Sequence, residues 1–227
     1  MAYGLPALNE GGMVQDNAAS EYKTLGGEGY AEIVVDRSRF IAYLRPVRSR
    51  GEAEVFFAEI RKRHHGAKHN VPCFVLGSDM GERWSSEDGE PQGTAGAPML
   101  QLLVSEGVTD VAAVVTRYFG GVKLGTGGLV RAYTAALKAA LADAGIVDVA
   151  PGISIRYRMS YPAFEKMRAA AARAGWTVSG AEYGDDVAFN VTGPEDAVAA
   201  MRLAASSAAG ANIQPVSVEA AEILLMV

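Results

Sequence analysis

The chain has 227 residues, of which 49% are hydrophobic and 21% charged, and its formal net charge is −5. This composition is typical of a globular protein with one large or two small domains, and it excludes a disordered chain. The negative net charge excludes a protein that coats nucleic acid through bulk charge alone.

Residues 1–19 show no sustained pattern, and we expect a flexible tail there. Beyond the tail, alternating apolar residues predict strands, and apolar residues three or four positions apart predict helices. The predicted strands are 30–35, 40–44, 71–76 and 111–116, and the predicted helices are 52–65, 98–104 and a long one with Leu129, Tyr133, Leu137 and Leu141 on one face. Between them, residues 77–98 form a long polar stretch, which is typical of a functional segment.

The stretch from Ala144 to Gly152 contains Gly145 and Pro151, which end the long helix and indicate a domain boundary. The following pattern is strand, helix, strand, strand, helix, strand, the order of a ferredoxin-like domain. The sequence therefore predicts an α+β protein with domains at 20–147 and 152–227. We expect the second to be a docking module, because it contains no histidine or cysteine.

A glycine-rich segment after the strand at 111–116 is the densest chemical signal. Its glycines allow positive φ and a close approach of backbone N–H groups to a ligand, and Thr126 is predicted to cap the following helix. A helix N-terminus favours an anion. The candidate binding residues are Arg117, Tyr118, Gly120, Gly121, Lys123, Gly125, Thr126, Gly127, Gly128 and Arg131. The segment matches neither a P-loop nor a dinucleotide fingerprint, so a strand-to-helix turn packed through glycine is the alternative.

An acidic loop is the second signal, with Glu87, Asp88 and Glu90 close together among glycine and proline. Carboxylate oxygens suit Mg²⁺ or Ca²⁺, but the spacing is not that of an EF-hand. We therefore predict no metal site and expect a solvated loop or a contact with basic groups.

Three histidines and the single cysteine lie near the end of the predicted helix 52–65. His64 and His69 lie on either side of the predicted helix end, and one or two of the three histidines suit a helix C-terminus. His69 is kept as an accessory site residue. A pair of His69 with Cys73, or a triad of Ser85 or Ser86 with His69 and Asp88, remains an alternative. No nucleophile elbow supports the triad, and a buried inert thiol is the commoner state of such a cysteine. We predict no catalytic residue.

Residues 36–70 contain nine Lys or Arg and four acidic residues, a net charge of +5 that leaves −10 for the rest of the chain. A local basic surface on an acidic protein is able to meet phosphate or an acidic partner. A solvated helix face with charged strand edges explains the same pattern.

Two long motifs resemble the IMPACT/YigZ family: Arg117-Tyr118-Phe119-Gly120-Gly121 continuing to Tyr133, and Ser86-Glu87-Asp88-Gly89-Glu90-Pro91 followed by Gly93-Thr94-Ala95-Gly96. The resemblance implies a first domain folded like the second domain of a small-subunit ribosomal protein. It also implies a second domain like the last domain of elongation factor G. Eukaryotic relatives regulate translation by competing for the activator of the starvation-sensing initiation-factor kinase.

These observations predict a non-enzymatic, translation-associated regulator or binding protein without a cofactor. Its expected partner is RNA, the ribosome or a translation-associated protein, with no DNA specificity. No apolar run approaches the ~18 residues that cross a membrane, so we expect a cytoplasmic protein without membrane contact. A phosphate-handling or hydrolytic enzyme that uses the glycine-rich segment and the acidic loop is the alternative, and a pure protein–protein adaptor is a third possibility.

Overall fold

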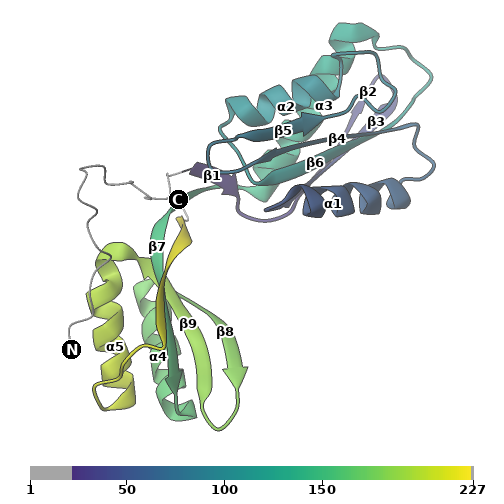
Figure 1. Cartoon of the computed structure of the whole chain (residues 1–227). Helices are drawn as coiled ribbons and strands as arrows, with labels where there is room; N and C mark the ends of the chain where they lie inside the picture. The colour runs from purple at the N-terminus through teal and green to yellow at the C-terminus, as the bar shows by residue number, and fades with distance from the viewer. Residues whose placement is uncertain (1–21, 226–227) are drawn as a thin grey trace, which may run out of the picture.

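The computed structural model describes residues 22–225, which form two β-sheets with helices packed against them (Figure 1). We call residues 29–144 the N-terminal lobe and residues 146–225 the C-terminal lobe. The predicted tail, residues 1–19, lies outside the described residues.

The sheet of the N-terminal lobe contains five strands, and all neighbours are antiparallel. In spatial order the strands are β2 (Gly29–Val35), β3 (Ser38–Pro46), β6 (Val111–Tyr118), β4 (His69–Leu76) and β5 (Glu82–Ser85). The three helices of this lobe are α1 (Arg50–Arg63), α2 (Gly96–Ser105) and α3 (Gly125–Ala144).

Helix α1 covers one face of this sheet, and helices α2 and α3 cover the other (Figure 1). The central strand β6 shows why both faces are apolar. Val111, Ala113 and Val115 pack toward α2 and α3, whereas Ala112 and Val114 pack toward α1. A strand that is buried on both faces carries a continuous apolar run, which is why 111–116 was recognisable from sequence.

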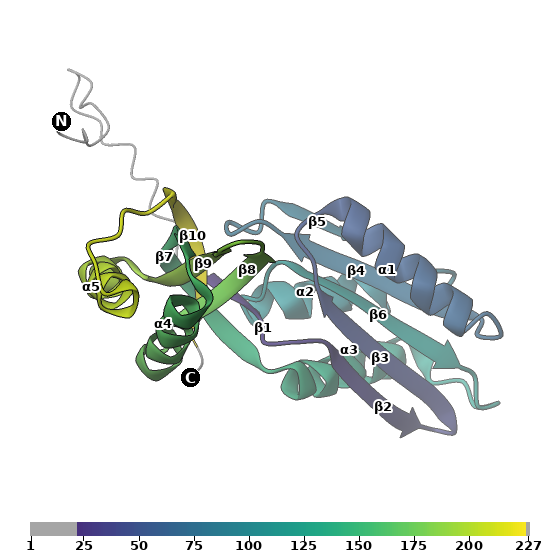
Figure 2. The same ribbon diagram turned by 90° about the horizontal axis from the view of Figure 1, so that it is seen from below.

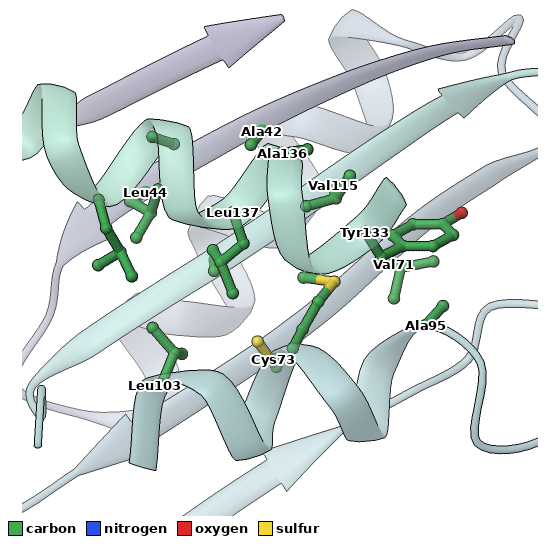
Figure 3. Close-up of a cluster of buried hydrophobic side chains, with 14 of the residues drawn as sticks. Ala42, Leu44, Val71, Cys73, Ala95, Leu103, Val115, Tyr133, Ala136 and Leu137 are labelled. Carbon is green, nitrogen blue, oxygen red and sulfur yellow. The ribbon is translucent and has the colours of Figure 1, made fainter. Parts of the chain in front are cut away.

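The larger core lies between the sheet and helices α2 and α3 (Figure 3). Cys73 points into it beside Leu103 and Leu137 and is fully buried. Burial raises the pKa of the Cys73 thiol, which keeps the sulfur protonated and unreactive. The prediction of a buried thiol is therefore confirmed, and Cys73 is no partner for His69.

The sheet of the C-terminal lobe has the strand order β10-β7-β9-β8, again antiparallel throughout. Helices α4 (Tyr161–Ala174) and α5 (Val198–Ala209) pack together on one face of it. The strands are β7 (Ile146–Met159), β8 (Thr177–Tyr183), β9 (Val187–Pro194) and β10 (Ser217–Leu225), and a short 3-10 turn, η1 (Glu195–Ala197), precedes α5. The predicted chain order of strands and helices in this half is confirmed.

Three local features differ from the predicted elements. Strand β5 lies inside the polar stretch 77–98, where no strand was predicted, and strand β1 (Tyr22–Leu25) was not predicted either. The boundary region 148–151 lies within the continuous strand β7, although α3 does end at Gly145, whose φ is +68°. Four-residue strands such as β1 and β5 are too short to show a clear alternation.

Strand β1 belongs to the C-terminal sheet through β7 but also contacts the N-terminal lobe, where Thr109 donates its N–H to the Lys23 carbonyl (Figure 2). A charged cluster lies at this junction. Arg48 Nη1 lies 2.6 Å from both Tyr22 Oη and Asp110 Oδ2, and 3.0 Å from Glu222 Oε2 of β10. The cluster therefore links the two lobes.

Alkaline pH is expected to weaken this junction, because burial, more than the nearby carboxylates, raises the pKa of Tyr22 to about 12. The folded state favours the neutral phenol, so its contribution is complete below pH 10 and is lost as the pH rises toward 12. In urea unfolding between pH 10 and 12, Tyr22→Phe should show a smaller fall in the free energy of unfolding than the wild type. Tyr183→Phe, at an exposed tyrosine, is the control; equal slopes for all three proteins would contradict the expectation.

Candidate functional site

A cleft of about 480 Å³ lies at the end of the N-terminal sheet where β6 leads into α3. Three segments that are far apart in sequence line it: residues 68–69, 89–91 and 117–129. The acidic loop and the glycine-rich segment therefore share one cleft. Its volume lies in the range of small-molecule sites.

The floor of the cleft is a buried ion pair. Arg117 Nη1 donates to Glu90 Oε1 at 2.7 Å, and the Tyr133 hydroxyl donates to the same oxygen at 2.8 Å. The side chain of Arg117 is 8% exposed and that of Glu90 is 3% exposed. Burial, reinforced by the charge of Glu90, raises the pKa of Tyr133 and keeps its hydroxyl a donor. Arg117 was predicted as a ligand-binding cation, but its charge is largely engaged within the protein.

His69 stands beside this pair at the start of β4. Its Nδ1 lies 2.8 Å from the carbonyl oxygen of Asp88, which only accepts hydrogen bonds, so Nδ1 carries the proton. Its Nε2 lies 3.9 Å from Glu90 Oε1 and borders the cleft. No hydrogen bond joins His69 to Ser85, Ser86 or Cys73 among residues 22–225, so the catalytic pairings considered from sequence are not formed.

The three carboxylates of the acidic loop have different roles. Glu87 accepts hydrogen bonds from four backbone N–H groups, those of Gly93, Ala95, Gly96 and Ala97, at 2.8–3.2 Å. It thereby caps helix α2, whose N-cap residue Ala95 has no side chain able to do so.

Asp88 fastens the loop to the sheet and to α1. Its Oδ2 accepts the Asn70 N–H at 2.6 Å, and its Oδ1 lies 3.4 Å from Arg61 Nη2. Glu90 is therefore the one carboxylate of the three that lines the cleft. Of the two outcomes expected for the acidic loop, Glu90 shows the contact with a basic group, because Arg117 and Tyr133 compensate its burial.

Helix α3 begins at Gly125, one residue before the predicted cap. Its N-cap is Leu124, and no side chain caps the helix, so Thr126 lies inside the first turn and the predicted Thr126 cap is wrong. Gly125 has a φ of +68°, which explains the glycine at this position. The N-terminus of α3 lines the cleft through Leu124, Gly125 and Thr126, next to Lys123.

The other predicted site residues are dispersed. Tyr118 lies on the α1 side of the sheet, where its hydroxyl is 3.0 Å from His64 Nδ1. Gly120 packs against the backbone of Arg37, where a Cβ atom would lie 2.0 Å from a carbonyl carbon. The remaining four do not line the cleft: Gly121, Gly127, Gly128 and Arg131.

Two residues that the sequence did not single out border the cleft, Lys68 and Phe119. Phe119 is 54% exposed, and the Arg117 guanidinium lies 5.5 Å from its ring centroid. The position of Phe119 between the end of a strand and a Gly-Gly turn was the available signal for its exposure. The following glycines have no side chains that could cover an aromatic ring.

The basic surface predicted for residues 36–70 has fewer unpaired cations than the net charge of this stretch suggests. Five of its nine cations form ion pairs: Arg39, Arg45, Arg48, Arg50 and Arg61. His64 is the C-cap of α1, as expected for a histidine there, and burial lowers its pKa. Of the nine cations, Lys68 is the one that reaches the cleft.

Within residues 22–225, no group of three or more His, Cys, Asp or Glu side chains is arranged to hold a metal ion. In the same range, no helix is long and apolar enough to cross a membrane.

This chain is similar to a known protein family and to several of its members. The model of the Impact N-terminal domain matches residues 36–141. The IMPACT family member YvyE of Bacillus subtilis (strain 168) is 45% identical over 127 residues, 56% of this chain and 58% of that protein. An IMPACT family member of Thermus thermophilus, described as lying in the pol 5′ region, is 38% identical over 129 residues, 57% of this chain and 69% of that protein.

A crystal structure of a hypothetical protein matches 88% of this chain and 98% of that chain, with 29% identity and a TM-score of 0.56. Most of the fold, including parts of both lobes, is therefore shared with a solved structure. The matched segment spans 58% of the length of YvyE. Residues 36–141, which the model of the Impact N-terminal domain matches, include both motifs at the cleft. The chain belongs to the IMPACT family.

Proposed function

We propose that this protein is a non-enzymatic, translation-associated regulator that contacts single-stranded RNA through the rim of the cleft. Membership of the IMPACT family supports the association with translation, since eukaryotic members of the family are regulators of translation. One juxtaposition carries the RNA contact: a half-exposed aromatic ring, two lysines and an uncapped helix N-terminus surround one cleft.

Each part of the rim suits one part of an RNA strand. Lys68 and Lys123 are exposed and attract phosphate, and the N-terminus of α3 adds N–H donors and a favourable dipole. Phe119 offers a face on which a base is able to stack. Because the protein is acidic overall, the contact is local and depends on shape.

Charge reversal at the rim tests this proposal. Lys68→Glu with Lys123→Glu should weaken binding of a fluorescein-labelled single-stranded RNA at least tenfold in fluorescence anisotropy. The salt slope should fall by about 1.4, because each lost phosphate contact on a single strand removes about 0.7. Lys62→Glu with Lys166→Glu makes the same change of charge away from the cleft. Equal losses for both pairs, or no loss for the rim pair, would contradict the proposal.

The domain folds implied by the family resemblance belong to the same proposal. The strand order β10-β7-β9-β8 with α4 and α5 on one face supports a ferredoxin-like domain at 152–227. The five-stranded sheet of the N-terminal lobe supports a ribosomal-protein-like domain at 20–147. The cleft lies within this first domain.

A second candidate is a phosphate-handling or hydrolytic enzyme. The observation that favours it is that Glu90 and the N-terminus of α3 line one cleft. Hydrolysis of a nucleotide or an RNA by the wild type, lost in Glu90→Gln, would support the enzyme. The engagement of Glu90 Oε1 by Arg117 and Tyr133 favours the binding protein, because the oxygen is held in fixed hydrogen bonds.

A further inference from the structure

The cleft contains an acceptor that the protein itself does not satisfy. Arg117 and Tyr133 both bind Glu90 Oε1, whereas Oε2 receives no hydrogen bond from residues 22–225. The Glu90 side chain is 97% buried, and the residue lines the cleft. Oε2 is not among the fully buried side-chain atoms that lack a partner within residues 22–225, so this oxygen is open to the cleft, where a ligand is able to donate a hydrogen bond to it.

A second acceptor, on His69, borders the same cleft. The Nδ1 proton of His69 is committed to the Asp88 carbonyl, so in the neutral ring Nε2 is an acceptor. This nitrogen is 3.9 Å from Glu90 Oε1, and His69 also lines the cleft. The cleft is therefore bordered by two acceptors from side chains that approach each other to 3.9 Å, and such a pair suits a ligand edge with two neighbouring donors.

The remaining walls fit the other parts of a nucleotide. Phe119 provides an exposed ring, and Leu124 and Leu129 add apolar surface. Lys123 and the uncapped N-terminus of α3 provide the anion site. A volume of about 480 Å³ accommodates a single nucleotide.

We propose that the cleft recognises a single guanine nucleotide, with the base donating to Glu90 Oε2 and His69 Nε2 and stacking on Phe119, and with the phosphate at the α3 N-terminus. Guanine is the base whose pairing edge carries two adjacent donors, the N1–H and the N2 amino group. Adenine, cytosine and uracil each place an acceptor beside their donor, which the Glu90 carboxylate would repel. The inference rests on the proposed contact with RNA and assigns its base specificity.

Isothermal titration calorimetry on the full chain with GMP, AMP, CMP and UMP tests the specificity without any variant. GMP should bind at least about tenfold more tightly than UMP, the discrimination expected for two well-placed hydrogen bonds to a base. Glu90→Gln should reduce this ratio to less than threefold, because the amide presents a donor to guanine. Glu82→Gln, on the exposed strand β5, is the matched control and should keep the ratio.

Two short RNAs separate a free nucleotide from a guanine in RNA. A 5′-phosphorylated hexamer with one 5′ guanine followed by uridines is compared with the all-uridine hexamer. Tighter binding of the guanine hexamer supports RNA as the source, whereas a preference for GMP without this difference supports the free nucleotide.

Three results would overturn the inference, and the first two leave the proposed function intact. If RNA binds but neither GMP nor the guanine hexamer is preferred, base recognition is refuted. A folded Glu90→Gln protein with undiminished guanine preference also refutes it. If neither RNA nor any nucleotide binds, the inference and the proposed function both fail.

Discussion

Replacement of Arg117 by methionine is expected to lower the free energy of unfolding by about 3–5 kcal/mol, the usual cost of breaking a buried ion pair from one side. The guanidinium holds Glu90 at 2.7 Å, and both side chains are more than nine-tenths buried. Methionine fills much of the volume but leaves the carboxylate without its compensating charge. Urea unfolding measures the loss, which is a large part of the total stability of an ordinary domain.

Two further variants separate the loss of the ion pair from other effects. Arg131→Met makes the same substitution at an exposed position on α3 and should change stability by less than about 0.5 kcal/mol. Arg117→Met combined with Glu90→Gln should recover part of the loss, since the neutral amide needs no cation. A loss below about 1 kcal/mol for Arg117→Met, or strictly additive losses in the double variant, would show that the pair is not coupled.

This role of Arg117 decides which variants are informative about binding. Removal of Arg117 is expected to disturb the floor of the cleft and the stability of the lobe together. A binding defect in that variant would therefore not identify a contact with a ligand. Lys68 and Lys123 are exposed at the rim, so their replacement changes the charge offered to a ligand without leaving a buried group unpaired.

The helices and strands of the core were predictable because their periods are long and regular. The apolar residues of α3 recur every four positions and are all buried in the hydrophobic core of the lobe: Leu129, Tyr133, Leu137 and Leu141. The apolar run of β6 is equally clear, since both faces of the strand are covered. Such patterns depend on which positions are buried, and buried positions are recognised in the sequence because they carry apolar residues.

The different roles of Glu87, Asp88 and Glu90 in the acidic loop were not predictable from composition. Asp88 has a φ of +44° and Gly89 of +84°, so the chain reverses between Glu87 and Glu90 and sends their side chains to different places. Neither helical nor strand spacing applies to such a turn. One signal was available: α2 follows Ala95, which cannot cap it, so a distant acceptor was required.

The cleft itself depends on three segments that meet only in the folded sheet. His69 lies opposite Arg117 in the register of β4 and β6, and the acidic loop crosses over this pair. The sequence showed each segment separately, and the family resemblance grouped their residues. Their spatial relation follows from the strand order β3-β6-β4, which a single sequence does not specify.

Replacement of Glu87 by alanine is expected to destabilise the N-terminal lobe by about 2–3 kcal/mol. An ordinary cap contributes roughly 1 kcal/mol, and hydrogen bonds to a charged group contribute about 1.5–3 kcal/mol. Glu87 receives four N–H groups, two of them from the first turn of α2. Because Met99 and Leu103 of this helix are fully buried in the core, loosening its start disturbs the packing on β4.

Loss of the Glu87 cap should change local amide exchange at the start of α2 as well as the free energy of unfolding. Amide hydrogen exchange measured by NMR should show reduced protection at Gly93 and Ala95 through Ala97 in Glu87→Ala. Glu87→Gln should fall between the two proteins, because one side-chain oxygen still accepts while the amide group faces N–H donors. Glu82→Gln removes a carboxylate from the exposed neighbouring strand and should leave both readouts unchanged. If Glu87→Ala retained wild-type protection at these amides, the capping of α2 would rest on groups other than this carboxylate.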